Sequence, residues 1–219
     1  MNEEKVKDIV YYYARLFEML KWVSFFRLIV YFVEKKNGGI SSKFVELWVF
    51  FHCVLSSMTI FAVYYFGEYK WIIYPIIVYG WMRVVEIIIY QINVLLFDPY
   101  RATQSNRPYQ VKGYLRMIIL LIHNAFEIVF WFSSIYMYFL QYFGVEDDVA
   151  NNIVQAFYIS FVTMTSFGLP NFVIKSSWGL GIISVQSFIG LIMTMLTFAR
   201  FISLLPMVRS GTKSESDDK

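Results

Sequence analysis

The chain has 219 residues, of which 58% are hydrophobic and 21% aromatic, and its mean hydropathy is +0.53. This composition differs strongly from that of a soluble globular domain and indicates an integral, multi-pass membrane protein. The net charge of +3 is too small and too scattered to indicate nucleic-acid binding, and the single cysteine, Cys53, excludes an intrachain disulfide.

The first predicted element is an amphipathic helix within residues 1–43. Residues 9–33 are apolar but are interrupted by four charged side chains: Arg15, Glu18, Lys21 and Arg27. A charge at the bilayer centre costs about 2.5–3.5 kcal/mol on insertion scales. We therefore expect the helix to lie along the cytoplasmic membrane interface, with its aromatic side chains at headgroup depth. A true first span, with its charges packed against neighbouring helices, is the alternative.

Four later segments are apolar and long enough to cross about 30 Å of hydrocarbon at 1.5 Å per residue. They cover residues 44–66, 71–97, 116–143 and 178–204. We expect residues 44–97 to form a two-helix scaffold and residues 116–205 to form a pore domain. A polar cytoplasmic loop over 98–115 separates the two, and residues 206–219 are too polar to fold and should be disordered.

Basic residues collect on one predicted side of the membrane. Eight occur up to Lys43, four lie between residues 98 and 116, and four lie from Arg200 onward, whereas the opposite side has Lys70 and Lys175. By the positive-inside rule, both termini are cytoplasmic and the loop between the last two spans lies outside. The predicted location is the plasma (inner) membrane.

The segment between the last two spans is too short to cross a bilayer. Residues 156–165 are semi-apolar and lead into the run Thr165-Ser166-Phe167-Gly168-Leu169-Pro170. Non-helical backbone at membrane depth persists only where it is buried in protein or lines water. We therefore expect a re-entrant loop over residues 148–170, whose helix starts after the carboxylates of residues 146–148. An apolar loop with chance hydroxyl groups is the alternative.

This segment resembles the pore of the tetrameric potassium-channel superfamily, over about residues 145–205. Residues 156–165 look like the pore helix, and residues 165–171 stand where the family has Thr-Thr-Val-Gly-Tyr-Gly-Asp. Leu169 replaces the tyrosine, Pro170 the second glycine and Asn171 the aspartate. Members that lack the second glycine are often weakly selective cation channels. The resemblance therefore implies a homotetramer that passes K⁺, with or without Na⁺, through a filter formed by Thr165, Ser166, Phe167 and Gly168.

The last span carries a stripe of five residues at helical spacing: Gln186, Gly190, Thr194, Thr197 and Phe201. A polar stripe on a membrane helix should face protein or water, and we predict that this one lines the pore. Interhelical contact through small and polar residues is the alternative. By the resemblance, Gly190 is a candidate gating hinge. Phe201 is either a hydrophobic gate or a lipid-facing side chain.

Ionisable residues also occur within the second and third spans. Arg83 and Glu86 lie three residues apart, and Glu127 falls at a similar predicted depth. Because such groups are rarely left without a partner in a membrane, we predict a structural ion pair of Arg83 with Glu127 or Glu86. A proton-transfer or voltage-sensing role is the alternative.

The histidines and the cysteine, His52, Cys53 and His123, do not form a metal-ligand pattern. The sequence also lacks a phosphate-binding glycine loop and a nucleophile elbow. We therefore predict no enzyme, no catalytic residue, no metal and no cofactor.

Together, these features predict an all-α membrane protein with four transmembrane helices, a re-entrant pore helix and an interfacial N-terminal helix. The predicted function is a potassium-channel-like cation channel whose partners are the lipid bilayer and further copies of the chain. The alternative function is a channel-like sensor or anchor that recruits a cytoplasmic protein in a bacterial stress or anti-phage defence system. A proton-coupled transporter is a third hypothesis, which the lack of pseudo-symmetric halves disfavours.

Overall fold

The computed structural model describes residues 9–24, 29, 31, 41–105, 113–143, 152–165, 168 and 174–204. The predictions for the acidic segment 146–148, for Ser166, Phe167 and Pro170, and for the tail 206–219 lie outside the described residues. Within the described part, all regular secondary structure is helical.

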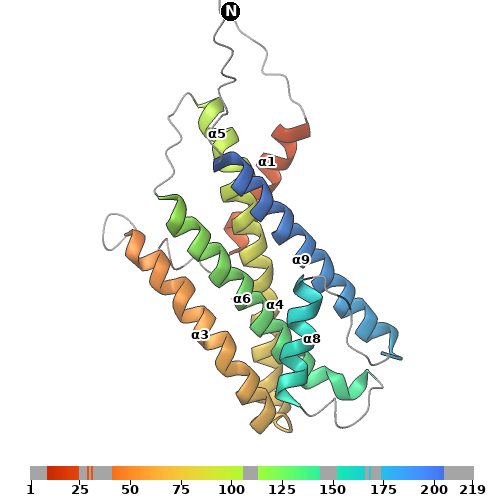
Figure 1. The fold of residues 1–219 in the computed structure, drawn as a ribbon. Coiled ribbons are helices and arrows are strands. Elements are labelled where there is room, and N and C mark those ends of the chain that lie inside the picture. The colour runs from red at the N-terminus through yellow and green to blue at the C-terminus, as the bar shows by residue number, and fades with distance from the viewer. Residues whose placement is uncertain are drawn as a thin grey trace, which may run out of the picture.

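Four long helices form one bundle: α3 (Ser42–Phe66), α4 (Lys70–Ile92), α6 (Tyr114–Phe139) and α9 (Ser177–Leu204) (Figure 1). The helical segments long and apolar enough to cross a membrane are Lys43–Phe66, Lys70–Gln104, Leu115–Tyr142 and Ser177–Ile202. Three of these segments agree with the predicted spans within two residues at each end. The other one, Lys70–Gln104, extends beyond its predicted end at residue 97. The chain is therefore all-helical where described, with the spans of a multi-pass membrane protein.

The second span is extended beyond its predicted end. After α4, a π-helical turn, η2 (Asn93–Phe97), leads directly into α5 (Asp98–Gln104). The sequence predicts a polar loop from residue 98. However, Pro99 lies in the first turn of α5, directly after the π-helical turn, and the chain stays helical through it.

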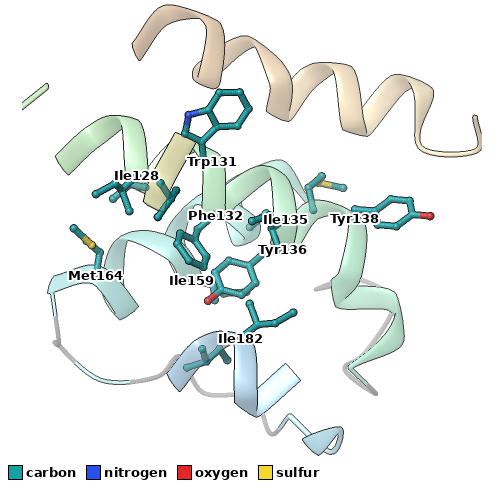
Figure 2. Close-up of a cluster of buried hydrophobic side chains, with 14 of the residues drawn as sticks. Ile128, Trp131, Phe132, Ile135, Tyr136, Tyr138, Ile159, Met164 and Ile182 are labelled. Atoms are coloured by element: carbon teal, nitrogen blue, oxygen red, sulfur yellow. The ribbon is translucent and has the colours of Figure 1, made fainter. Parts of the chain in front are cut away.

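Helix α6 lies at the centre of the bundle and contacts α3, α4, α8 (Ile153–Thr165) and α9. Its side chains Trp131, Phe132 and Tyr136 are almost completely buried. Figure 2 shows Phe132 and Tyr136 pointing toward Ile159 of α8 and Ile182 of α9. The main apolar core therefore joins the third span to the short helix and to the last span.

The N-terminal helix α1 (Ile9–Leu20) and its final turn η1 (Lys21–Val23) run antiparallel to the end of the second span. Arg101 Nη1 donates to the carbonyl of Ala14 (3.1 Å), the Phe17 and Phe97 rings stack, and Ser24 Oγ donates to Glu86 Oε1. At 12 residues, α1 is about 18 Å long and too short to span the hydrocarbon. The predicted position at the membrane interface stays a prediction.

Candidate functional site

The short helix α8 begins with a side-chain cap. Asn152 Oδ1 accepts hydrogen bonds from the backbone N–H groups of Val154 (2.9 Å) and Gln155 (3.3 Å). Asparagine is a favoured N-cap because its oxygen satisfies backbone donors that lack an intrahelical acceptor. The sequence analysis missed this cap, although an Asn directly before an apolar helical segment is the usual signal for one.

The C-terminal end of α8 lies against the middle of α9. A Cβ atom added to Gly190 would lie only 2.3 Å from the backbone oxygen of Met164, so only a glycine allows this approach. Gly190 is 13 residues after Ser177 and 14 residues before Leu204, which places it about 20 Å from either end of α9. Helix α8 therefore ends at about half the length of the last span.

The segments on either side of α8 meet at one end of the bundle. The backbone N–H groups of Lys175 (3.1 Å) and Ser176 (3.3 Å) donate to the carbonyl of Phe143, which follows η3 (Leu140–Tyr142). The end of the third span is thereby tied to the start of the fourth. From near this end, α8 runs back along α6 and lies between α6 and α9 (Figure 1).

Two of the four predicted filter residues are described. Thr165 is the last residue of α8 and is exposed, and its hydroxyl donates to the carbonyl of Phe161 (2.9 Å). Gly168 has a φ of +109°, a conformation that side chains with a Cβ rarely adopt. The chain therefore leaves the helix at Thr165 and takes a glycine-dependent backbone conformation three residues later.

The first half of the predicted stripe on α9 faces the interior of the chain. Gln186 is fully buried, and its Oε1 accepts a hydrogen bond from the Tyr136 hydroxyl (2.7 Å). Its Nε2 donates to the backbone oxygen (2.9 Å) and to Oγ (2.8 Å) of Ser160, whose hydroxyl donates to the carbonyl of Val129 (2.7 Å). This neutral cluster, formed by Gln186, Tyr136 and Ser160, joins α6, α8 and α9.

The second half of the stripe is not covered by α8, which ends beside Gly190. Thr194 is exposed, Phe201 is 49% exposed, and Thr197 is half-buried with its hydroxyl bonded to the Met193 carbonyl (2.7 Å). Interhelical contact, the alternative explanation of the stripe, therefore describes Gln186 and Gly190. Thr194 and Phe201 remain open to water, lipid or another copy of the chain.

A second polar cluster lies between α4 and α6. The Arg83 guanidinium donates to both oxygens of Glu127 (2.7 and 3.2 Å) and to Glu86 Oε2 (2.6 Å). Arg83, Glu86 and Glu127 are 5%, 8% and 0% exposed. The arginine thus contacts both carboxylates that the sequence analysis offered as alternatives. Two carboxylates and one guanidinium leave one net negative charge, which donors from Trp131 Nε1 (3.3 Å) and Ser24 stabilise.

Side chains of α3 and α4 complete the surroundings of this charged cluster. The Trp48 ring lies 5.9 Å from the Arg83 guanidinium carbon. His52 Nδ1 is 2.9 Å from the Trp48 carbonyl, which can only accept, so Nε2 is left to accept from the Tyr79 hydroxyl at 2.8 Å. Both ring nitrogens of His52 are thereby engaged, and no group of three His, Cys, Asp or Glu side chains suited to a metal occurs among the described residues.

No protein-family model, no curated protein and no solved structure matches the chain.

Proposed function

We propose that the chain is the subunit of a homotetrameric cation channel whose pore is built from α6, α8, the segment after Thr165 and α9. The observation that carries this proposal is the contact between Met164 and Gly190. It supports a path in which the chain enters the bilayer with α8, stops near half depth and returns to the same side before Ser177.

The end of α8 suits a cation site. The C-terminal end of a helix carries partial negative charge, and α8 points this end toward the middle of the bundle. The carbonyl groups of residues 165–168 then follow, and such groups can replace the hydration shell of a cation when several copies surround one axis. One chain supplies a fraction of such a ring, so the proposed pore requires further copies of the chain.

The uncovered half of the stripe on α9 supplies a candidate lining for the path below this site. Thr194 and Thr197 offer hydroxyl groups, and Phe201 lies one helical turn further along. In the proposed tetramer these side chains face the axis. Gln186 and Gly190 are assigned to holding α8 in place. The contact with Met164 explains why residue 190 is a glycine, without a role as a gating hinge.

Ion flux into liposomes tests the proposal. Purified chain reconstituted into potassium-loaded liposomes should release K⁺, whereas empty liposomes should not. Thr194→Cys, made in a Cys53→Ser background, should become sensitive to a charged, water-soluble thiol reagent. Met195→Cys is the matched control, because Met195 is 61% exposed on the neighbouring face of α9. Equal sensitivity of both variants, or no flux from assembled protein, would contradict the proposal.

A membrane sensor or anchor that binds a cytoplasmic protein is the second candidate. The observation that favours it is the outer face of α1, where Tyr12, Leu16 and Met19 are 50–64% exposed. An assembled protein that conducts no ions, yet binds a soluble protein encoded beside it only when α1 is intact, would favour this function over the channel.

A further inference from the structure

A polar pocket lies between α1 and α5, away from the proposed pore. Its cavity volume is about 440 Å³. The polar side chains that line it are Tyr11, Arg15 and Glu18 on α1, Tyr100, Arg101 and Gln104 on α5, and Ser105 directly after α5. Among the groups that can only donate or only accept, two guanidinium groups face one carboxylate, and the hydroxyl and amide groups of the lining can do either.

One of the two arginines is fixed in place. Arg101 donates from Nη1 to the Ala14 carbonyl (3.1 Å) and from Nη2 to Asn93 Oδ1 (2.8 Å) and Asp98 Oδ1 (2.7 Å). A guanidinium has five N–H groups, so these three bonds leave two for a ligand. Arg15 donates to the Tyr11 hydroxyl (3.3 Å) and is exposed, so it is free to turn toward a bound group.

The charges around the pocket favour an anion. Arg15 and Arg101 together exceed the charge of Glu18 by one, and the neighbouring Lys21 and Asp98 pair with each other at 3.1 Å. A phosphate group has the oxygens that planar guanidinium groups bind best. A phosphodiester carries one negative charge, which would balance the one excess positive charge of the lining.

The length of the second span suits a position of the pocket at the depth of lipid headgroups. Asp98, the first residue of α5, is 28 residues after Lys70 in one continuous helical span, which is about 42 Å. A bilayer with its headgroups is about 40–45 Å thick. If Lys70 is at one surface, α5 and the pocket are at the opposite surface, which the basic residues identify as cytoplasmic.

We propose that this pocket binds the phosphate group of an anionic phospholipid in the leaflet on the α5 side. The phosphate contacts Arg15 and the two remaining N–H groups of Arg101. The acyl chains extend from the pocket toward the hydrocarbon and can reach the exposed apolar side chains of α1, such as Met19. Basic pockets at the ends of membrane helices are a recognised form of anionic lipid binding. The lipid would join α1 to the second span.

Lipid retention by the delipidated full chain tests this site. The chain is placed in nanodiscs of phosphatidylcholine with and without phosphatidylglycerol, and bound lipid is measured by native mass spectrometry after release. Phosphatidylglycerol should be retained over phosphatidylcholine. Arg15→Gln should lower its retention about fivefold. Lys43→Gln removes an equally exposed positive charge from α3, outside the pocket, and should leave retention unchanged.

A gain of binding provides the second test, because misfolding cannot produce it. Glu18→Gln removes the carboxylate from the lining and should increase phosphatidylglycerol retention. Equal losses in Arg15→Gln and Lys43→Gln would overturn the proposal in favour of general attraction to an anionic surface. Displacement of the lipid by inorganic phosphate or glycerol 3-phosphate would identify a soluble phosphate as the ligand and overturn the lipid assignment.

Discussion

Helix α6 carries two buried polar clusters that differ in charge and in what they hold. Glu127 and Tyr136 are nine residues apart, which is two and a half helical turns, so they leave α6 on opposite sides. Glu127 binds Arg83 of α4 in the charged cluster, and Tyr136 binds Gln186 of α9 in the neutral cluster. The same helix therefore joins the scaffold with charges and the proposed pore with neutral hydrogen bonds.

This difference indicates which part of the bundle can move. Breaking a buried ion pair leaves a charge without compensation in a low dielectric and is strongly unfavourable. Hydrogen bonds between membrane helices contribute much less, about 0.6 kcal/mol on average. We therefore expect α4 and α6 to stay together. Any movement within the bundle should occur first between α8 and its neighbours, because it breaks neutral hydrogen bonds and apolar packing rather than an ion pair.

The largest effect is expected when the charged cluster loses its arginine. Arg83→Met leaves Glu86 and Glu127 without their cation, and the free energy of unfolding in detergent should fall by about 3–5 kcal/mol. Arg116→Met is the matched control on α6, because Arg116 pairs with the exposed Glu46, an interaction worth about 0–1 kcal/mol. Equal losses in both variants would remove the distinction between buried and exposed pairs.

A double-mutant cycle sharpens the same point. The double variant Arg83→Met/Glu127→Gln should lose less free energy of unfolding than the two single variants lose together. The reason is that Glu127→Gln removes a negative charge that Arg83→Met leaves without a partner. Additive losses would show that the two groups do not act as a pair.

The next largest effect concerns the position of α8. Gly190→Ala forces the new methyl group into the Met164 carbonyl and should cost about 1–3 kcal/mol of stability and most of the ion flux. Gly181→Ala, on the same helix, meets no atom within 4 Å and should leave both unchanged. Normal flux in Gly190→Ala would mean that the contact at half depth is not needed for conduction.

Loss of the neutral cluster should have a smaller effect. Tyr136→Phe removes the donor to Gln186 and should lower the free energy of unfolding by about 1 kcal/mol. Ser184→Ala removes a hydroxyl whose one hydrogen bond among the described residues is to the carbonyl of Leu180 on its own helix, and serves as the control. A loss in Tyr136→Phe as large as that in Arg83→Met would contradict the comparison between the two clusters.

A similarly small effect is expected at the start of α8. Asn152→Ala should lower the free energy of unfolding by about 1 kcal/mol because two backbone donors lose their acceptor. Asn152→Asp keeps an oxygen at the same place and should restore the stability. Failure of Asn152→Asp to restore it would assign the effect to something other than the cap.

The sequence predicted the long helices well because apolar runs of more than 20 residues have few other structures available in a bilayer. It also placed Arg83, Glu86 and Glu127 at similar depth, since helical rise converts residue number into depth. It could not divide the stripe on α9, because periodicity gives the face of a helix but not the length of its neighbour. Only the end of α8 beside Gly190 separates the covered residues from the uncovered ones.

The N-terminal region was harder to predict for a different reason. Its charges argued against a simple span, but one of them, Lys21, has its partner 77 residues away in the chain. Lys21 pairs with Asp98, and Arg101 reaches the Ala14 carbonyl. Contacts of this kind depend on the continuation of the second span through Gln104, which the sequence analysis interpreted as a polar loop from residue 98.

A single-particle structure of the assembled protein in a lipid nanodisc, in potassium solution, tests the central claim most directly. The account predicts four copies with their α8 helices pointing at one axis and Thr165 and Gly168 of all four chains around a common water-filled path. Chains whose α8 ends lie apart, each enclosed within its own bundle, would contradict it.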